Sequence, residues 1–86
     1  FRRVLFRSYP QEAQIRGFEG EAILALDISE TGRILKATLH RSSGHAILDD
    51  AALQFAATLQ LEPAVQGMTP VSVSVLLPIR YRLVGP

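Results

Sequence analysis

The chain contains no cysteine and no tryptophan, and aromatic residues make up only 7% of it. The absence of cysteine excludes a disulfide framework and a thiolate metal site. No apolar run approaches the roughly 18–20 residues that span a bilayer, so we expect any export signal or membrane tether to lie upstream of the printed sequence. What remains is 86 residues, 48% of them hydrophobic and 20% charged, which is typical of one small globular domain.

The formal net charge of +1 depends on the first eight residues, FRRVLFRS. Without their three arginines, six basic residues face eight acidic ones, a net charge of −2. The octet is the translation of TTC-AGA-CGT-GTG-CTC-TTC-CGA-TCT, part of a common sequencing adapter. We therefore interpret residues 1–8 as a non-native or disordered segment and residues 9–86 as the domain. The alternative is a basic arm that contacts a membrane or nucleic acid; the remaining basic residues are scattered, so we expect no nucleic-acid binding.

Two strands and a short helix are predicted in the first half of the chain. Residues 11–15 favour one or two helical turns, which Gly17 and Gly20 end. Apolar residues then alternate over residues 22–28, and again over residues 33–41 after a turn at residues 29–32. The two predicted buried faces are Ala22, Leu24, Leu26 and Ile28, and Leu35, Ala37 and Leu39. Ile34 falls out of phase with the second set, which indicates a β-bulge.

The second half predicts a main helix, a loop and a long strand. Apolar residues at three- and four-residue spacing define the helix: Leu48, Ala51, Ala52, Phe55 and Leu59. Asp49 and Asp50 suit its first turn, Pro63 ends it, and residues 64–69 are expected to form a loop. Every second residue from 71 to 83 is apolar, which predicts a strand over residues 70–83 with one buried face.

The predicted fold class is α+β, with a three-stranded antiparallel sheet, a main helix on one face and a short N-terminal helical turn, in the order β-β-α-β. Pro78 lies inside the last strand. Because proline cannot donate to a ladder, that strand needs an unpaired edge or a bulge there, and pairing with a partner should be interrupted or bend at this residue.

The ordered series of short motifs resembles the TonB C-terminal domain family over essentially all of residues 9–86. The matching pieces are Tyr9-Pro10, Ala13, Gly17, Gly20, the strand of residues 22–28, Gly32-Arg33-Ile34, Ser42-Ser43-Gly44, Leu48-Asp49, Ala51-Ala52-Leu53, Pro63-Ala64, Gly67 and Pro78-Ile79-Arg80-Tyr81-Arg82-Leu83. No single piece is specific, but their order and spacing together are.

The resemblance implies a periplasmic, non-enzymatic domain without a cofactor, at the outer end of an energy transducer. Such a domain binds an extended segment, the TonB box, of outer-membrane receptors and couples proton-motive force to the uptake of nutrients such as siderophores. The family's inner-membrane helix and its contacts with proton-channel proteins of the ExbB/ExbD type would lie upstream. Related alternatives are a TonB-like module of a membrane sensor or peptidase and a Tol-type envelope protein, which the upstream sequence would distinguish.

The candidate partner-binding residues lie at the start of the domain and on the last strand: Tyr9, Pro10, Val75, Leu76, Leu77, Ile79, Arg80, Tyr81 and Arg82. A strand edge exposes backbone groups that an extended partner can bind, and the two arginines could meet acidic groups on it. The same edge could pair with a second copy or exchange strands, so a homodimer through residues 71–83 is a further possibility.

Other chemistry has weaker support in the sequence. Ser42, Ser43, His45 and Asp49 are the residue types of a hydrolase, but serines before a glycine are more often turn and cap residues. His40 and His45 with Asp49 or Asp50 match no known metal-ligand spacing. A small-molecule effector site lacks a glycine-rich or polar pocket signature. We therefore expect neither an enzyme nor a metal site.

Overall fold

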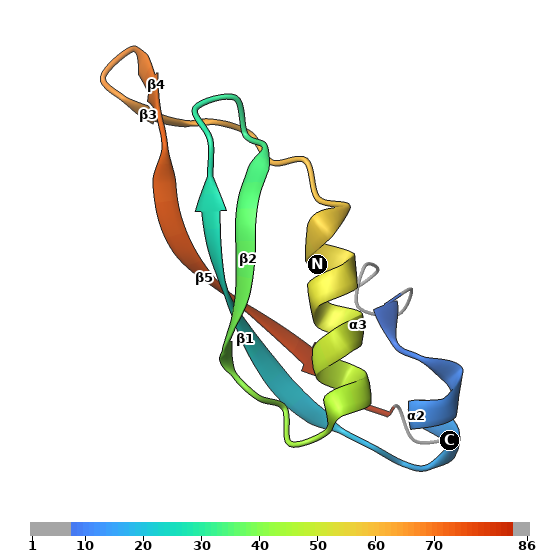
Figure 1. Ribbon diagram of the computed structural model, residues 1–86. Helices are drawn as coiled ribbons and strands as arrows, with labels where there is room; N and C mark the ends of the chain where they lie inside the picture. Colours follow the sequence, from blue (N-terminus) through green and yellow to red (C-terminus); the bar gives the residue numbers. More distant parts are fainter. Residues whose placement is uncertain (1–7, 84–86) are drawn as a thin grey trace.

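The computed structural model describes residues 8–83, which form a two-layer α+β domain (Figure 1). The proposed non-native segment therefore lies, except for Ser8, outside the described residues. The elements are α2 (Gln11–Ile15), β1 (Gly20–Ile28), β2 (Ile34–Arg41), α3 (Ala46–Ala57), β3 (Ala64–Gln66), β4 (Thr69–Val71) and β5 (Val73–Tyr81). The predicted fold class is confirmed, with the β3–β4 hairpin as an addition.

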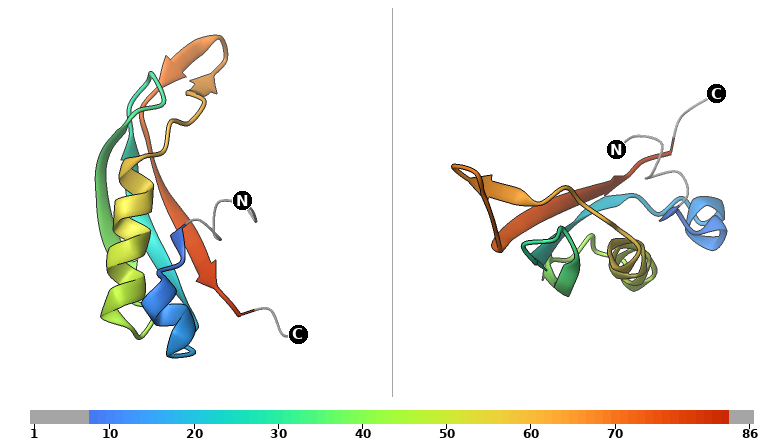
Figure 2. Two further views of the ribbon diagram at one scale, coloured as in Figure 1. Left: turned by 90° about the vertical axis from the view of Figure 1, so that its right-hand side faces the viewer. Right: turned by 90° about the horizontal axis from the view of Figure 1, so that it is seen from above.

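Three strands form one antiparallel sheet in the order β2-β1-β5, so the first strand in the sequence is the central one. α3 lies across one face of this sheet, and α2 lies beside it near the start of β1 (Figure 2). β3 and β4 pair with each other as a separate two-stranded hairpin that extends from one end of the domain.

The core lies between α3 and the inner face of β1, as the alternation of apolar residues predicts. Ala22, Leu24, Leu26 and Ile28 are all buried, and Ala52 and Ala56 bring α3 close to them. β5 contributes Ile79 and Tyr81 near its end. The fully buried side chains therefore gather where the helix covers the sheet.

β2 follows β1 with two irregularities in its register. Asp27 pairs with Lys36, but Ile28 pairs with Ile34, so Leu35 is an extra residue between them. The bulge that Ile34 indicated is confirmed, and it overturns the expectation for Leu35, which is 63% exposed instead of buried. A second shift, between Ile23 and Leu24, leaves His40 unpaired in the same way.

The segment that follows α3 differs from the prediction. The helix ends at Ala57, so Leu59 lies beyond it and not on its apolar stripe. The expected loop contains strand β3 and leads into β4. Gly32, with φ of 84°, accepts a hydrogen bond from Leu61 N–H at 3.0 Å, and a Cβ there would collide with the Leu61 carbonyl. This contact fixes the start of the segment against the β1–β2 turn.

Candidate functional site

β5 has one free edge along its whole length. On one side its nine residues pair with β1 in unbroken register, from Val73 opposite Ile28 to Tyr81 opposite Gly20. Within residues 8–83, no strand pairs with its other side. A free edge of this kind presents a row of backbone N–H and C=O groups that can bind an extended chain.

Pro78 lies in the middle of this edge and is paired with Ile23 without any register shift. Of the two sequence-based options for this residue, the bulge is wrong and the unpaired edge is confirmed. The pyrrolidine ring is exposed, so it occupies the outer part of the sheet and not the core.

The candidate side chains on β5 divide into an exposed group and a buried group. Val75 is 40% exposed and Leu76 is 55% exposed, whereas Ile79 and Tyr81 are at most 1% exposed. Leu77 is partly buried against the core. Side chains in the first half of β5 are therefore available to a neighbouring strand, whereas Ile79 and Tyr81 hold the second half to the domain.

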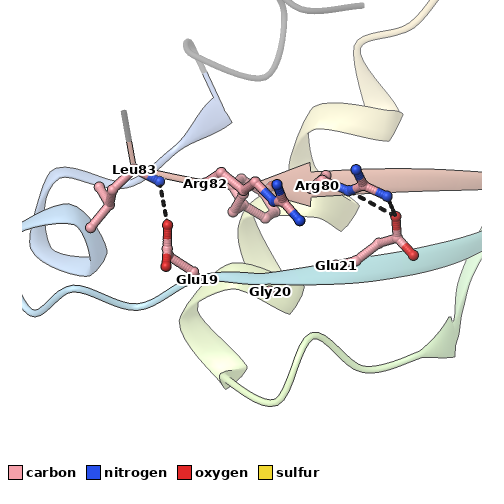
Figure 3. A pocket seen from close by; sticks show the side chains of 7 residues that line it. Glu19, Gly20, Glu21, Arg80, Arg82 and Leu83 are labelled. Atoms are coloured by element: carbon pink, nitrogen blue, oxygen red, sulfur yellow. Dashed lines mark hydrogen bonds and ion pairs between the residues drawn. The ribbon is translucent and has the colours of Figure 1, made fainter. Parts of the chain in front are cut away.

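Charged groups surround the end of β5 (Figure 3). The Arg80 guanidinium donates to Glu21 Oε2 from Nε at 3.3 Å and from Nη2 at 3.2 Å. The backbone N–H of Leu83 donates to Glu19 Oε2 at 2.6 Å. Arg82 is exposed between them, in an open hollow lined by the start of β1 and the end of β5. Arg80 is thus already paired within the domain, whereas Arg82 has no ion pair among the described residues.

Tyr9 and Pro10 lie away from the exposed part of β5. The Tyr9 ring packs edge-on against Tyr81, with 5.2 Å between ring centroids, and its hydroxyl donates to the Phe18 carbonyl. Burial, with a smaller contribution from the Glu19 charge, raises the pKa of Tyr9. Only 8% of Tyr9 is exposed, and Pro10 is the partly buried N-cap residue of α2. Tyr9 thus packs against the end of β5, and little of its side chain is left for a partner to contact.

The cluster with hydrolase-like residue types holds a loop to a helix. Asp49 accepts hydrogen bonds from Ser42 Oγ at 2.5 Å, Ser43 Oγ at 2.8 Å and Ser43 N–H at 2.8 Å. Burial disfavours the charged carboxylate most strongly, but the hydrogen bonds from both serines outweigh it and lower the pKa of Asp49. The His45 ring stacks on Phe18, with centroids 4.2 Å apart. Ser42 and Ser43 therefore contact the Asp49 carboxylate directly, and the His45 ring contacts Phe18. This is not the order of a serine–histidine–aspartate triad, in which the histidine lies between the other two.

This loop also touches the start of β1. A Cβ at Gly20 would collide with the Ser43 carbonyl, so only glycine permits the close approach of the two backbones. Gly20 is in turn the pairing partner of Tyr81. The loop between β2 and α3 thus supports the end of β5 through β1.

Two kinds of feature are absent from the part of the chain that the structure describes. Residues 8–83 contain no group of three His, Cys, Asp or Glu side chains placed to hold a metal ion. No helix in the same residues has the length and apolar character needed to cross a membrane.

The architecture defines a class of small α+β domains in which a central helix covers one sheet face and the last strand is an open edge. The sequence model of the family described as Gram-negative bacterial TonB protein C-terminal matches residues 7–83. The chain belongs to this family. The resemblance stated from the sequence motifs is therefore confirmed.

Individual relatives agree with the family assignment. Protein TonB of Vibrio cholerae serotype O1 is 32% identical over 77 residues, which cover 90% of this chain. The match spans 32% of that relative, so the chain corresponds to about a third of its length.

Two NMR solution structures of Helicobacter pylori TonB-CTD share the fold. The longer has a TM-score of 0.70 and 30% identity, with 99% of this chain and 78% of that chain covered. The shorter has a TM-score of 0.68 and 31% identity, with 92% and 85% covered.

Two features of the site were not anticipated from the sequence. The Glu21–Arg80 ion pair joins residues 59 positions apart, and the Leu83–Glu19 hydrogen bond joins residues 64 positions apart. Aligning the apolar alternation of β1 with that of β5 allows the register that places Glu21 opposite Arg80, but it equally allows a register shifted by two residues.

Proposed function

We propose that this domain is the periplasmic end of a TonB-type energy transducer and binds the TonB box of outer-membrane transporters by strand addition to β5. The observation that carries the proposal is the free edge of β5 beside an unbroken β1–β5 ladder. Each added backbone hydrogen bond contributes a net stabilisation of about 0.5–1.5 kcal/mol. A few such bonds give reversible binding of the transporter segment, as transport requires.

The side chains of β5 add selectivity to this binding. In strand addition, backbone groups give affinity and alternate side chains give specificity. Val75 and Leu76 offer exposed apolar surface on opposite faces of the sheet, and Arg82 offers a positive charge at the end. An extended segment with apolar side chains and an acidic group matches this pattern. The proposal includes no catalytic step and no cofactor.

The remaining parts of the proposed activity lie outside this chain. Proton-motive force would enter through inner-membrane proteins of the ExbB/ExbD type, which contact regions upstream of the domain, and a transmembrane helix there would tether it. The proposal assigns this domain only the contact with the transporter.

The test is a titration of the isotope-labelled chain with a synthetic peptide that carries the TonB box of an outer-membrane transporter. We expect amide chemical-shift changes concentrated on residues 75–82. The control is the same peptide N-methylated at alternate residues, in two versions, one for each side of the extended chain. The version that removes the donors facing β5 should abolish the changes. Changes confined to residues 42–50 would contradict the proposal.

A further inference from the structure

Pro78 determines which backbone groups the free edge of β5 offers. Residues directly opposite each other in an antiparallel pair alternate between two arrangements. In one, the two residues exchange N–H···O bonds; in the other, their backbone groups point away from each other. Pro78 has no N–H, yet it faces Ile23 within an unbroken register. The pair is consistent with the second arrangement, in which the backbone of Pro78 faces the free edge.

A second observation supports this orientation. The N–H of Leu83 donates to the side chain of Glu19, which immediately precedes β1. In an extended chain, N–H groups of residues two positions apart point to the same side. Odd-numbered residues of β5 therefore direct their N–H groups toward β1, and even-numbered residues direct theirs toward the free edge.

The free edge consequently has a gap among its donors. Ser74, Leu76 and Arg80 offer both an N–H and a C=O group, whereas Pro78 offers only its carbonyl. A short strand that pairs with Ser74 and Leu76 loses nothing to this gap. A strand that continues past Pro78 leaves one of its own acceptors without a donor.

Symmetry makes this gap more costly for a second copy of the chain than for a foreign strand. In a two-fold dimer every contact occurs twice. Two β5 edges that pair antiparallel across Pro78 therefore lose the donors of both prolines, whereas a transporter segment loses at most one. A buried or paired acceptor without its donor is costly in stability.

We propose that Pro78 is a specificity-determining residue of the β5 edge, which interrupts backbone pairing with a partner strand at one donor and disfavours edge-to-edge pairing between two copies of this chain. The part that concerns the partner rests on the proposed function. The part that concerns self-association rests only on the geometry of β5, so the two can fail separately.

The experiment compares self-association of the 86-residue chain and its Pro78→Ala variant by sedimentation equilibrium, without any added peptide. Alanine restores the missing donor at an exposed position, so the fold should be retained. We expect the dimer of Pro78→Ala to be tighter by about tenfold or more, from two additional hydrogen bonds. The new backbone amide at position 78 should also become protected from hydrogen exchange as the dimer forms.

The matched control is Pro70→Ala, the same change at an exposed proline of β4. Pro70 faces Val65 in the separate hairpin, so this variant should associate no more strongly than the parent chain. A dimer formed by strand exchange would keep the β1–β5 pairing and contribute equally to both variants. The difference in dimer affinity between Pro78→Ala and Pro70→Ala therefore measures pairing through the β5 edge.

A rescue variant separates the missing donor from other effects of the substitution. Leu76→Pro in the Pro78→Ala background removes the neighbouring donor that faces the same edge, and should return the chain to the weak association of the parent.

Equal association of Pro78→Ala and Pro70→Ala would overturn the proposal. A Pro78→Ala dimer whose hydrogen-exchange protection lies on residues 34–41 would also overturn it. If Pro78→Ala associates tightly while no transporter peptide binds β5, only the proposed function fails.

Discussion

β2 and β5 are both edge strands of one sheet, and each pairs on one side with β1. β2 has two register shifts and carries Lys36 and Arg41, features that disfavour the addition of another strand. β5 has nine residues in unbroken register and only one charged residue, Arg80, which is paired with Glu21. The comparison indicates that one edge is protected against pairing and the other is left available, with Pro78 as its single restriction.

The two strands are also anchored differently. The loop after β2 is held to α3 by the hydrogen bonds of Asp49, whereas β5 is held by its ladder and by the buried side chains of Ile79 and Tyr81. Removing Asp49 should therefore loosen the β2 side first.

Replacement of Asp49 by alanine should have the largest effect on stability. It leaves the Ser43 N–H and the Ser42 hydroxyl without their acceptor, while the Ser43 hydroxyl keeps the His45 carbonyl at 3.1 Å, and should lower the free energy of unfolding by about 2 kcal/mol. Urea unfolding at pH 7 measures this, with Asp50→Ala, an exposed neighbour, as the control. An equal loss in both variants would show that the Asp49 hydrogen bonds contribute nothing specific.

The same residue predicts a pH dependence. Because the folded-state pKa of Asp49 is lowered, its contribution is fully present above the unfolded-state value of about 3.9. The contribution is lost as the pH falls through the lower folded-state pKa. Unfolding curves between pH 6 and pH 2 should therefore be flatter for Asp49→Ala than for the parent. Parallel curves would contradict this assignment.

Removal of the bulge at Leu35 in β2 should produce an intermediate effect and make this edge more like that of β5. Deletion of Leu35 keeps the pairs Asp27–Lys36 and Ile28–Ile34 but places them in regular register. Leu35 is 63% exposed, so little packing is lost. We expect the variant to fold and to self-associate more strongly through residues 34–41, as measured by sedimentation and hydrogen exchange. A monomer as soluble as the parent would show that the charges and the second register shift protect this edge without the bulge at Leu35.

The smallest effect is expected for Glu21→Gln. The ion pair with Arg80 is exposed, with side chains of Arg80 and Glu21 58% and 36% accessible, so its loss should change stability by less than about 1 kcal/mol. The change releases Arg80 and should reduce the difference between the edges, because β5 then carries an unpaired cation, as β2 does. Thermal unfolding checks the stability, and a loss well above about 1 kcal/mol would mean that the pair holds β5 in place.

The alternation of apolar residues predicted the three strands of the main sheet and the inner faces of β1 and β5, but it was wrong for β2, where Leu35 is 63% and Leu39 is 39% exposed, and it did not show how much of each face is covered. α3 has 12 residues and spans ~18 Å, whereas the nine residues of β1 or β5 span ~30 Å. The sheet therefore extends beyond the helix. Val75 is 40% exposed although it lies on the inner face, and no local pattern could reveal this.

The candidate site was predictable in part, for similar reasons. The length and parity of the last strand, together with Pro78, indicated an open edge. The internal pairing of Arg80 depends on register, and the burial of Tyr9 depends on contact with Tyr81, which is far away in the sequence. The β3–β4 hairpin was missed because each of its strands has only three residues, too few for a period to be visible.

The unbroken pairing of β5 with β1 has a mechanical consequence. A partner strand bound along β5 and pulled along its own axis would load all its backbone bonds at once in shear, and β5 would pass that tension to β1 through nine aligned residue pairs. A pull directed away from the sheet would instead peel the bonds open one after another. The direction in which the domain is pulled therefore determines the lifetime of the complex between β5 and its partner strand under tension.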